Sequence, residues 1–391
     1  MRIQFMIDKN LGFYKCKGVD FQSKIDACTY SQICKQPITW VFHNDVYDHY
    51  DWHIEPEAGL DQLYDLRARQ LREQYDYLVL SYSGGADSNN ILESFIRQGL
   101  HIDEIVTNHV TKATKSITVL DATVTKAWNF GAEHELQAVP RLQYIQKHLP
   151  RTKITVLDVS DSIVDTLTKI DDPRWVLGRG DKLSVGQSFR YNYFYFAEIK
   201  RTLDRGASVA IVVGTDKPKT FIRDHELYLS FVDRVVNIAN INDYNREYSN
   251  TKVELFYWAE TTAPLICKQA HVIRRWLEAN PGEQEFWQER NIKTDVVRLH
   301  HERRLRDILY TNWNSDWYQA DKSTSWWHSE FDTWFHSNQE FASQSAAWRR
   351  GLDFVVDRVP DYVVRDQSGT PDGLQLFKNN YKIGAIGAGK Q

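Results

Sequence analysis

The sequence is poor in cysteine, and the few cysteines it has are scattered. Cys16, Cys28, Cys34 and Cys267 form neither a CxxC pair nor the spacing of a zinc site. A chain without a disulfide or zinc framework is expected to be a reduced, intracellular protein. The N-terminal stretch also lacks the apolar core of a signal peptide, and no apolar run is long enough to cross a bilayer. We therefore expect a soluble, cytoplasmic protein without membrane contact.

An excess of charge of one sign is missing as well. The 391 residues include 48 Lys and Arg against 52 Asp and Glu, a formal net charge of -4. This balance gives no indication of a general nucleic-acid binder, but a local basic face stays open because net charge averages it away. Hydrophobic residues make up 42% of the chain, enough for the cores of two or three domains. Nothing in the sequence indicates the oligomeric state.

The pattern of expected elements divides the chain into three parts. Residues 1–74 are expected to form a small β-rich segment, with an extended candidate at Ile38–Phe42, followed by a lead-in helix. Residues 75–235 alternate between strands and helices, which predicts an α/β domain with a doubly wound parallel sheet. Residues 236–391 are expected to form a mostly helical domain that binds the substrate or a partner.

The α/β part is expected to contain four strands with helices between them. The strands are predicted at Tyr77–Ser81, Ile102–Asn108, Ile154–Val159 and Ser208–Val213, and the helices at about 88–98, 134–148 and 186–204. Open α/β sheets bind ligands beyond the carboxyl ends of their strands. The residues that follow each strand are therefore candidates for a site.

Helical patterns also appear outside this part. They cover 60–74 in the first part of the chain and 264–279 and 295–309 in the last part. A Trp-rich stretch over 313–348 favours loops and short helices. The Gly-rich tail over 381–391 is expected to be frayed.

One stretch combines a strand, a turn and a helix in a way that indicates its chemistry. The strand expected at Tyr77–Ser81 runs into Ser-Gly-Gly-Ala-Asp-Ser at 83–88 and then directly into a helix. Adjacent glycines can adopt positive φ and turn their N–H groups towards a ligand, while a helix N-terminus adds unpaired amides and partial positive charge. This combination favours an anion, above all phosphate. A plain Gly-Gly turn with a Ser or Asp helix cap is the alternative.

The amino-acid sequence of this loop indicates one family. The common phosphate loop, GxxxxGK[ST], requires a lysine that residues 83–88 lack. The segment instead resembles the SGGxDS signature of the ATP pyrophosphatase (PP-loop) superfamily, with its adenine nucleotide alpha hydrolase-like fold, which includes asparagine synthetase, GMP synthetase and NAD synthetase. All six motif positions match. The resemblance covers residues 77 to about 220, is specific only at this loop, and implies an enzyme that cleaves ATP between the α and β phosphates and attaches AMP to a substrate oxygen.

The resemblance also implies which residues bind ATP and Mg²⁺. Asp87 is expected to be catalytic and to ligate the metal. The residues expected to contact ATP are Ser81, Ser83, Gly84, Gly85, Ala86, Asp87, Ser88, Asn108, Gly214 and Thr215. Asn108 and its neighbour His109 follow the second strand, where family members contact adenine through backbone groups. A lone histidine in such a place is more often structural than catalytic.

A second segment, at 214–219, is similar in place and wording to the Gly-Thr loop of GMP and NAD synthetases. Asp216 is expected to hold Mg²⁺ together with Asp87, because Mg²⁺ usually takes one or two carboxylates besides phosphates. Lys217 or Lys219 would neutralise charge on the departing pyrophosphate. The sequence departs from the family at Lys219, where GMP synthetase has an acid, so metal ligation by this loop and a plain charged turn both stay open.

A third piece lies in the helix expected over 186–204. Its Phe189-Arg190-Tyr191 portion resembles the Arg-Tyr helix of tRNA(Ile)-lysidine synthetase and related members. The resemblance implies that Arg190 reaches the nucleotide phosphates or the substrate and belongs to the catalytic residues. An arginine on the solvated face of an aromatic helix is the alternative.

Within the family, two cysteine-dependent subclasses are disfavoured. Thiolating members generally use a cysteine pair or an iron-sulfur cluster, and members with an integral glutaminase use an N-terminal cysteine where this sequence reads Met1-Arg2. What remains is an ATP-dependent, asparagine-synthetase-like ligase or amidase. It would adenylate a carboxylate or carbonyl oxygen of an unknown acceptor, release pyrophosphate, and let a nitrogen nucleophile displace AMP.

Two other interpretations stay open. The first is a PP-loop enzyme that modifies nucleic-acid bases. The second is a non-catalytic ATP-binding subunit that serves in interactions, which the altered loop at 214–219 favours.

Overall fold

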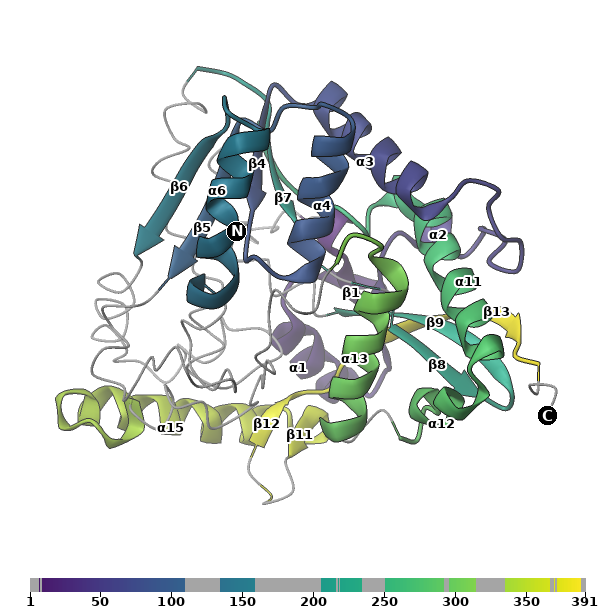
Figure 1. The fold of residues 1–391 in the computed structure, drawn as a ribbon. Coiled ribbons are helices and arrows are strands. Elements are labelled where there is room, and N and C mark those ends of the chain that lie inside the picture. Colours follow the sequence, from purple (N-terminus) through teal and green to yellow (C-terminus); the bar gives the residue numbers. More distant parts are fainter. Residues whose placement is uncertain are drawn as a thin grey trace.

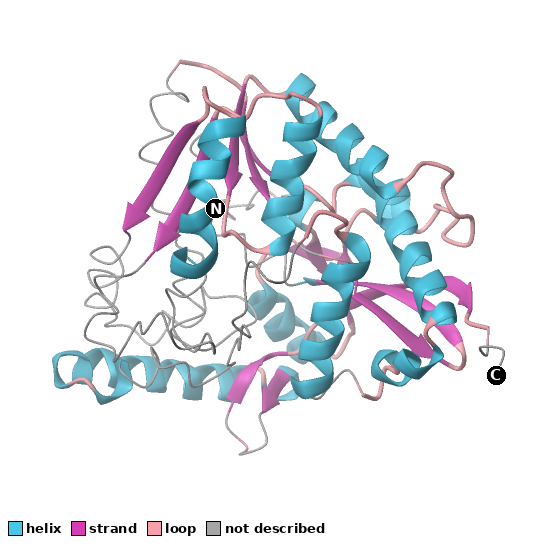
Figure 2. Cartoon of the chain, viewed as in Figure 1, coloured by secondary structure: helices cyan, strands magenta, loops and turns pink. Residues whose placement is uncertain are grey.

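The structure is a computed structural model. It describes residues 7, 9–109, 134–158, 205–215, 217, 219–233, 250–291, 295–313, 335–365, 369 and 371–387. Strands, helices and loops of these parts are distinguished in Figure 2. None of the helices in them has the length and apolar character needed to cross a membrane.

A five-stranded sheet forms the centre of the α/β part (Figure 1). Its strands are β4 (Tyr77–Ser81), β5 (Glu104–His109), β6 (Lys153–Asp158), β7 (Val209–Val213) and β10 (Thr251–Leu255), in the order β10-β7-β4-β5-β6. All neighbours pair in parallel. The central strands β4 and β7 are apolar and buried, as expected of a sheet covered on both faces. The prediction of an α/β protein with a parallel sheet is confirmed, and the sheet is compatible with a doubly wound fold.

The four strands predicted from the sequence begin and end within two residues of β4, β5, β6 and β7. The fifth strand, β10, lies in the part of the chain that we expected to be mostly helical. Its residues alternate between buried and more exposed positions, because β10 is the edge strand next to β7. The parallel sheet therefore extends past residue 235, where we had placed the end of the α/β part.

The strand order reverses between β4 and β7. From β4 the chain moves through β5 to β6 on one side, and then returns to β7 and β10 on the other side. The connections that leave β4 and β7 at their carboxyl ends therefore diverge. In open α/β sheets, such a reversal point opens a crevice where ligands bind.

Helices flank this sheet. Figure 1 shows α4 (Ala86–Arg97) and α6 (Val139–His148) in front of the strands, with a π-helical turn at His134–Ala138 leading into α6. The helix α3 (Leu60–Gln74) has the predicted bounds. It buries Leu63, Ala68 and Leu71 along one stripe, as the periodicity requires.

The N-terminal part contains the expected β-rich unit. The strands β1 (Phe13–Cys16), β2 (Val19–Phe21) and β3 (Ile38–Val41) form an antiparallel sheet in the order β2-β1-β3. Between β2 and β3 lies the helix α1 (Lys24–Cys34), which begins at the N-cap Ser23.

A second antiparallel sheet joins distant parts of the sequence. It contains β8 (Lys219–Arg223), β9 (Glu226–Val232) and β13 (Lys378–Ala385), in the order β13-β9-β8. The prediction of a frayed tail is wrong for residues 381–387, because β13 pairs with β9 and the side chains of Ile383 and Ile386 are buried.

The remaining elements are mostly helical and lie in the last part of the chain. The helices α11 (Ala263–Ala279) and α13 (Asp295–Leu309) match their predicted ranges within one residue. The 17-residue helix α15 (Ala342–Arg358) was not predicted, since we expected loops and short helices up to residue 348. The short elements are α2 (Asn44–Tyr47), α12 (Gln284–Trp287), β11 (Val363–Arg365), β12 (Pro371–Leu374) and 3-10 turns at Lys9–Leu11, Glu260–Thr262, Pro281–Glu283, Gln339–Phe341 and Pro360–Tyr362.

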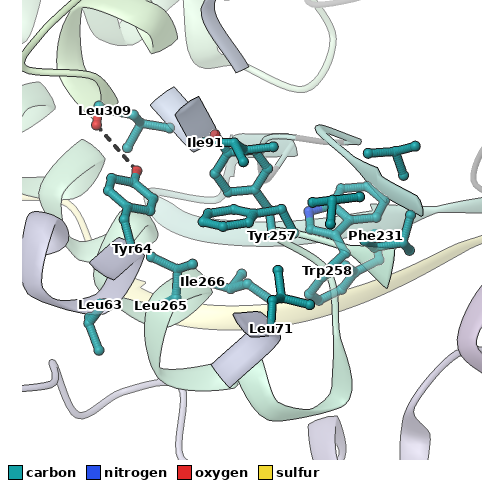
Figure 3. Close-up of a cluster of buried hydrophobic side chains, with 14 of the residues drawn as sticks. Leu63, Tyr64, Leu71, Ile91, Phe231, Tyr257, Trp258, Leu265, Ile266 and Leu309 are labelled. Atoms are coloured by element: carbon teal, nitrogen blue, oxygen red, sulfur yellow. Dashed lines mark hydrogen bonds between the residues drawn. The ribbon is translucent and has the colours of Figure 1, made fainter. Parts of the chain in front are cut away.

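The core is rich in aromatic rings (Figure 3). Tyr64 of α3 and Tyr257, which follows β10, pack edge to face with ring centroids 5.9 Å apart. Trp258 packs in the same way on Phe231 of β9, at 5.1 Å. Such pairs contribute packing beyond their buried area. Aromatic packing of this kind thus holds together elements that are distant in the sequence.

Candidate functional site

The loop at 83–88 lies at the carboxyl end of β4 and forms the N-terminus of α4. Gly84 adopts φ +79°, which residues with a side chain rarely take. A Cβ on Gly84 would lie 2.6 Å from the backbone nitrogen of Ala138 and 2.8 Å from its Cα. Glycine is therefore required twice, for its conformation and for the close approach of the turn at His134–Ala138.

Hydrogen bonds from within the protein fix the shape of the loop. The side-chain amide of Asn89 donates to the carbonyl oxygens of Gly84 at 2.5 Å and Gly85 at 3.2 Å, and the Tyr82 hydroxyl holds Asn89 by donating to its Oδ1 at 2.7 Å. The amide of Gly85 donates to Ser83 Oγ at 3.2 Å, so this one amide already has a partner in the protein.

The first turn of α4 remains suited to an anion. Gly85 occupies the N-cap position with an extended backbone and has no side chain that could accept from the amides of the first turn. The N–H groups of the first helical residues have no partner within a helix, and they attract negative charge. The residues present here thus fit a phosphate group.

The second predicted segment meets the first one. The strand β7 pairs with β4, and Gly214 follows it directly, so that a Cβ on Gly214 would lie 3.2 Å from Cβ of Asp87. Ser81 ends β4 and Thr215 follows Gly214 at the same edge of the sheet. The two segments therefore approach each other at the reversal point of the sheet.

The carboxylate of Asp87 is the centre of this site. Nζ of Lys217 donates to Oδ1 at 2.9 Å and to Oδ2 at 2.8 Å, and the hydroxyl of Tyr310 donates to Oδ1. The Tyr257 hydroxyl donates to the backbone oxygen of Asp87 at 2.9 Å. The side chain of Lys217 is only 4% exposed, whereas that of Asp87 is 29% exposed and so can meet a ligand.

Glu302 of α13 extends the network to the second lysine. Nζ of Lys219 lies 2.6 Å from Oε1 of Glu302, and Nζ of Lys217 lies 3.6 Å from Oε2. Burial by itself would raise the pKa of Glu302, but the charges of Lys219 and Lys217 outweigh it and hold the pKa well below its usual range. Glu302 is therefore ionised, and two lysines face two carboxylates.

The two tyrosines act as neutral donors. Burial, followed by the negative charge of Asp87, raises the pKa values of Tyr257 and Tyr310 well above 10. Each hydroxyl therefore keeps its proton at any ordinary pH and donates to Asp87.

Three residues of this network were not predicted to belong to the site. Tyr257 follows the carboxyl end of β10, so the rule that selected the other strand ends would have found it if β10 had been recognised. Glu302 and Tyr310 belong to α13 and its C-terminal end, and nothing in their local sequence indicates a place beside Asp87.

The end of β5 carries the residues expected near adenine. Asn108 is exposed there, and the ring of His109 stacks on that of His134 with centroids 4.6 Å apart. Nδ1 of His134 lies 3.3 Å from Oγ1 of Thr107. His109 therefore packs against the turn that covers Gly84.

The remaining predictions concern two site residues and the metal ion. Arg190 and Asp216 lie outside the described residues. Within the described parts of the chain, no group of three or more His, Cys, Asp or Glu side chains could hold a metal ion. Asp87 alone is compatible with Mg²⁺, since that ion commonly takes one or two carboxylates and completes its shell with phosphates and water.

A scan against models of known protein families finds none that matches this chain, and a search among curated proteins finds no relative. The function of the site is accordingly inferred from its residues and their geometry.

Proposed function

We propose that this protein is an ATP-dependent, AMP-forming ligase of the PP-loop type, with an asparagine-synthetase-like reaction. One observation carries the proposal. The SGGADS loop lies at the carboxyl end of β4, at the reversal point of a parallel sheet, and its Asp87 meets Lys217 from the loop after β7. This is where an open α/β sheet binds a ligand, and the residues there suit phosphate and its counter-charges.

The residues divide the work of nucleotide binding. The first-turn amides of α4 would hold the β and γ phosphates, with the hydroxyls of Ser83 and Ser88, 3.4 Å apart, at the same turn. Lys217 and Lys219 would stabilise the charge that develops on the departing pyrophosphate. Mg²⁺, when bound to Asp87 and the phosphates, would neutralise further charge.

The chemistry then follows from the cleavage position. An acceptor carboxylate or carbonyl oxygen attacks the α phosphorus, a P–O bond forms, and pyrophosphate leaves with the electrons of the broken bond. AMP is a much better leaving group than the original oxygen. A nitrogen nucleophile can then attack the activated carbon, lose a proton and release AMP. The protein contributes position and charge and forms no covalent bond itself.

The test is the formation of AMP and pyrophosphate. Purified protein is incubated with Mg·ATP, ammonium and a panel of carboxylic acids and amides, and nucleotides are separated by chromatography. An acceptor-dependent rise in AMP with equimolar pyrophosphate is expected. Asp87→Asn and Lys217→Met should each lower the rate by about 100-fold, the usual loss for one electrostatic group of an active site.

Asp76→Asn is the matched control. Asp76 precedes β4 at the opposite end of the strand, where it accepts hydrogen bonds from Ser208, and its substitution should leave the rate unchanged. Binding of ATP without AMP formation across the panel would instead support a non-catalytic nucleotide-binding subunit. AMP formation that survives both site substitutions would contradict the proposal.

A further inference from the structure

Two groups at one side of the site come from the same helix. Glu302 lies in the middle of α13, and Tyr310 follows its last residue. Tyr310 reaches Oδ1 of Asp87, and Glu302 lies 3.6 Å from Nζ of Lys217. A helix distant in sequence from both loops thus contacts each partner of the central ion pair.

The two oxygens of Asp87 are held differently. Lys217 contacts both of them, but Tyr310 contacts Oδ1 only. Tyr310 is 2% exposed, and its ring packs against those of Tyr64 and Tyr257, with centroids 6.3 and 6.1 Å away. Its hydroxyl is therefore fixed in place. A ligand can therefore bind Oδ2 by displacing Lys217 alone, whereas at Oδ1 it would also have to displace Tyr310.

Lys217 has a second carboxylate within reach. A divalent cation at Oδ2 would repel the ammonium group that now lies 2.8 Å from this atom. Among the described residues, Glu302 offers this alternative, because Lys219 holds its Oε1 while Oε2 faces Lys217. A small rotation of the lysine side chain would shorten the distance of 3.6 Å between its Nζ and Oε2 of Glu302 to hydrogen-bond distance.

We propose that α13 positions Asp87 for a divalent cation. Tyr310 fixes Oδ1, and Glu302 receives Lys217 when the cation binds at Oδ2. Both are positioning residues, since Tyr310 acts through Asp87 and Glu302 acts through Lys217. This inference rests on the proposed function in one respect, namely that the cation arrives with the phosphates of ATP.

The test compares ATP binding with and without a cation. Isothermal titration calorimetry gives the affinity for ATP in the presence of Mn²⁺, used as the probe, and again in EDTA. The ratio of the two affinities measures the cation's contribution. Tyr310→Phe and Glu302→Gln should each reduce this ratio by about tenfold, since loss of a group that orients a metal ligand typically weakens the metal site by that much.

Each variant has a matched control. Tyr64 belongs to the same ring cluster, but its hydroxyl donates to the Leu309 oxygen at 3.2 Å instead of to Asp87 (Figure 3), so Tyr64→Phe removes a buried hydroxyl that does not contact the Asp87 carboxylate. Glu283 pairs with His300 and Arg304 of α13, so Glu283→Gln removes a carboxylate that also braces this helix. Both controls should keep the wild-type ratio.

The possible results separate the two proposals. If wild type binds ATP more tightly with Mn²⁺, but the two site variants keep the ratio of their controls, the positioning role of α13 is wrong and the nucleotide site stands. If wild type binds no ATP in either buffer, both proposals fail. Should Tyr310→Phe not fold, the ratio of Glu302→Gln still decides the matter, because its side chain is a quarter exposed and tolerates the change.

Discussion

At the scale of single residues, the phosphate loop depends on the missing side chain of Gly84. Gly84→Ala forces a side chain onto φ +79° and into the backbone of Ala138, which cannot move aside like a flexible side chain. The free energy of unfolding should fall by roughly 2 to 5 kcal/mol, from strain and overpacking together. ATP binding should be lost as the loop shifts. Urea denaturation and calorimetry measure the two effects.

Gly99 provides the control for this prediction. It has φ +61°, but a Cβ there would meet nothing within 4 Å. Gly99→Ala should therefore show the conformational strain alone, about 1 kcal/mol, and leave ATP binding intact. Equal losses in the two variants would mean that the contact with Ala138 contributes nothing.

A second prediction at the scale of residues concerns the loss of stability at acidic pH. His301 is 3% exposed, and its Nε2 lies 3.1 Å from the Thr220 oxygen. Burial lowers its pKa to about 4, against the opposing charge of Glu302. The unfolded chain binds the proton near the ordinary pKa of 6.5, so stability is highest above pH 6.5 and falls as the pH drops towards 4. At pH 5 the loss should be about 2 kcal/mol, at 1.36 kcal/mol per pKa unit.

The variant His301→Gln tests this assignment. Glutamine cannot take up the proton, so the difference in unfolding free energy between pH 7.5 and pH 5, from urea titrations, should shrink by the share of His301. His43, whose pKa burial also lowers to about 4, should keep part of the acid sensitivity in the variant. A variant with the full acid sensitivity of wild type would show that His301 is not responsible.

Residues of the site differ in how far the sequence could reveal them. The loops at 83–88 and 214–219 were predicted from their sequence motifs and because each follows an apolar strand, since strand ends of a parallel sheet gather at one edge. Tyr310 and Glu302 were not, because their place beside Asp87 depends on how α13 packs. That packing is decided by contacts such as Trp287 on His301, 4.4 Å between centroids, which no local pattern encodes.

At the scale of elements, strong periodicity made the prediction reliable. The bounds of β4, α3 and α13 agree with the sequence, since each has a clear apolar run or stripe. The strands β10 and β13 were missed. β10 is polar on one side because it is an edge strand, and β13 contains glycine and two asparagines that are unfavourable in strands by themselves. Pairing with β7 and β9 overrides these weak preferences.

The role of β13 gives the prediction at this scale. Ile383 is fully buried although its strand is largely polar. Ile383→Ala should lower the free energy of unfolding by roughly 2 to 5 kcal/mol, the usual range for emptying such a position. Asn380→Ala, at an exposed position of the same strand, should change it by less than about 0.5 kcal/mol. Guanidinium denaturation measures the loss of unfolding free energy in both variants. Equally small losses would show that β13 does not contribute to the stability of the fold.

At the scale of the whole molecule, distant parts of the sequence are interlocked. Lys24 of α1 pairs with Asp233, which follows β9, at 2.7 Å, and its Nζ also donates to the Gln375 oxygen at 3.2 Å. The hydroxyl of Tyr14 in β1 donates to the same carboxylate at 2.8 Å. One buried ion pair therefore connects segments that we assigned to the first, second and third parts of the chain. From the sequence we divided the chain into three parts by the order of their elements, but these contacts connect residues of all three parts.

This ion pair yields the last prediction. The side chains of Lys24 and Asp233 are 3% and 0% exposed, so Asp233→Ala leaves a buried ammonium group without its counter-charge. The free energy of unfolding should fall by about 3 to 5 kcal/mol, and the double variant Lys24→Met, Asp233→Leu should lose less than this, because no charge is left unpaired. The exposed pair of Arg223 and Glu289, each 42% exposed, is the control, and Glu289→Gln should cost about 1 kcal/mol or less. If Asp233→Ala loses no more unfolding free energy than this control, the ion pair of Lys24 and Asp233 does not hold the segments together. Removing the partner of a buried charge must destabilise the protein if that ion pair connects them.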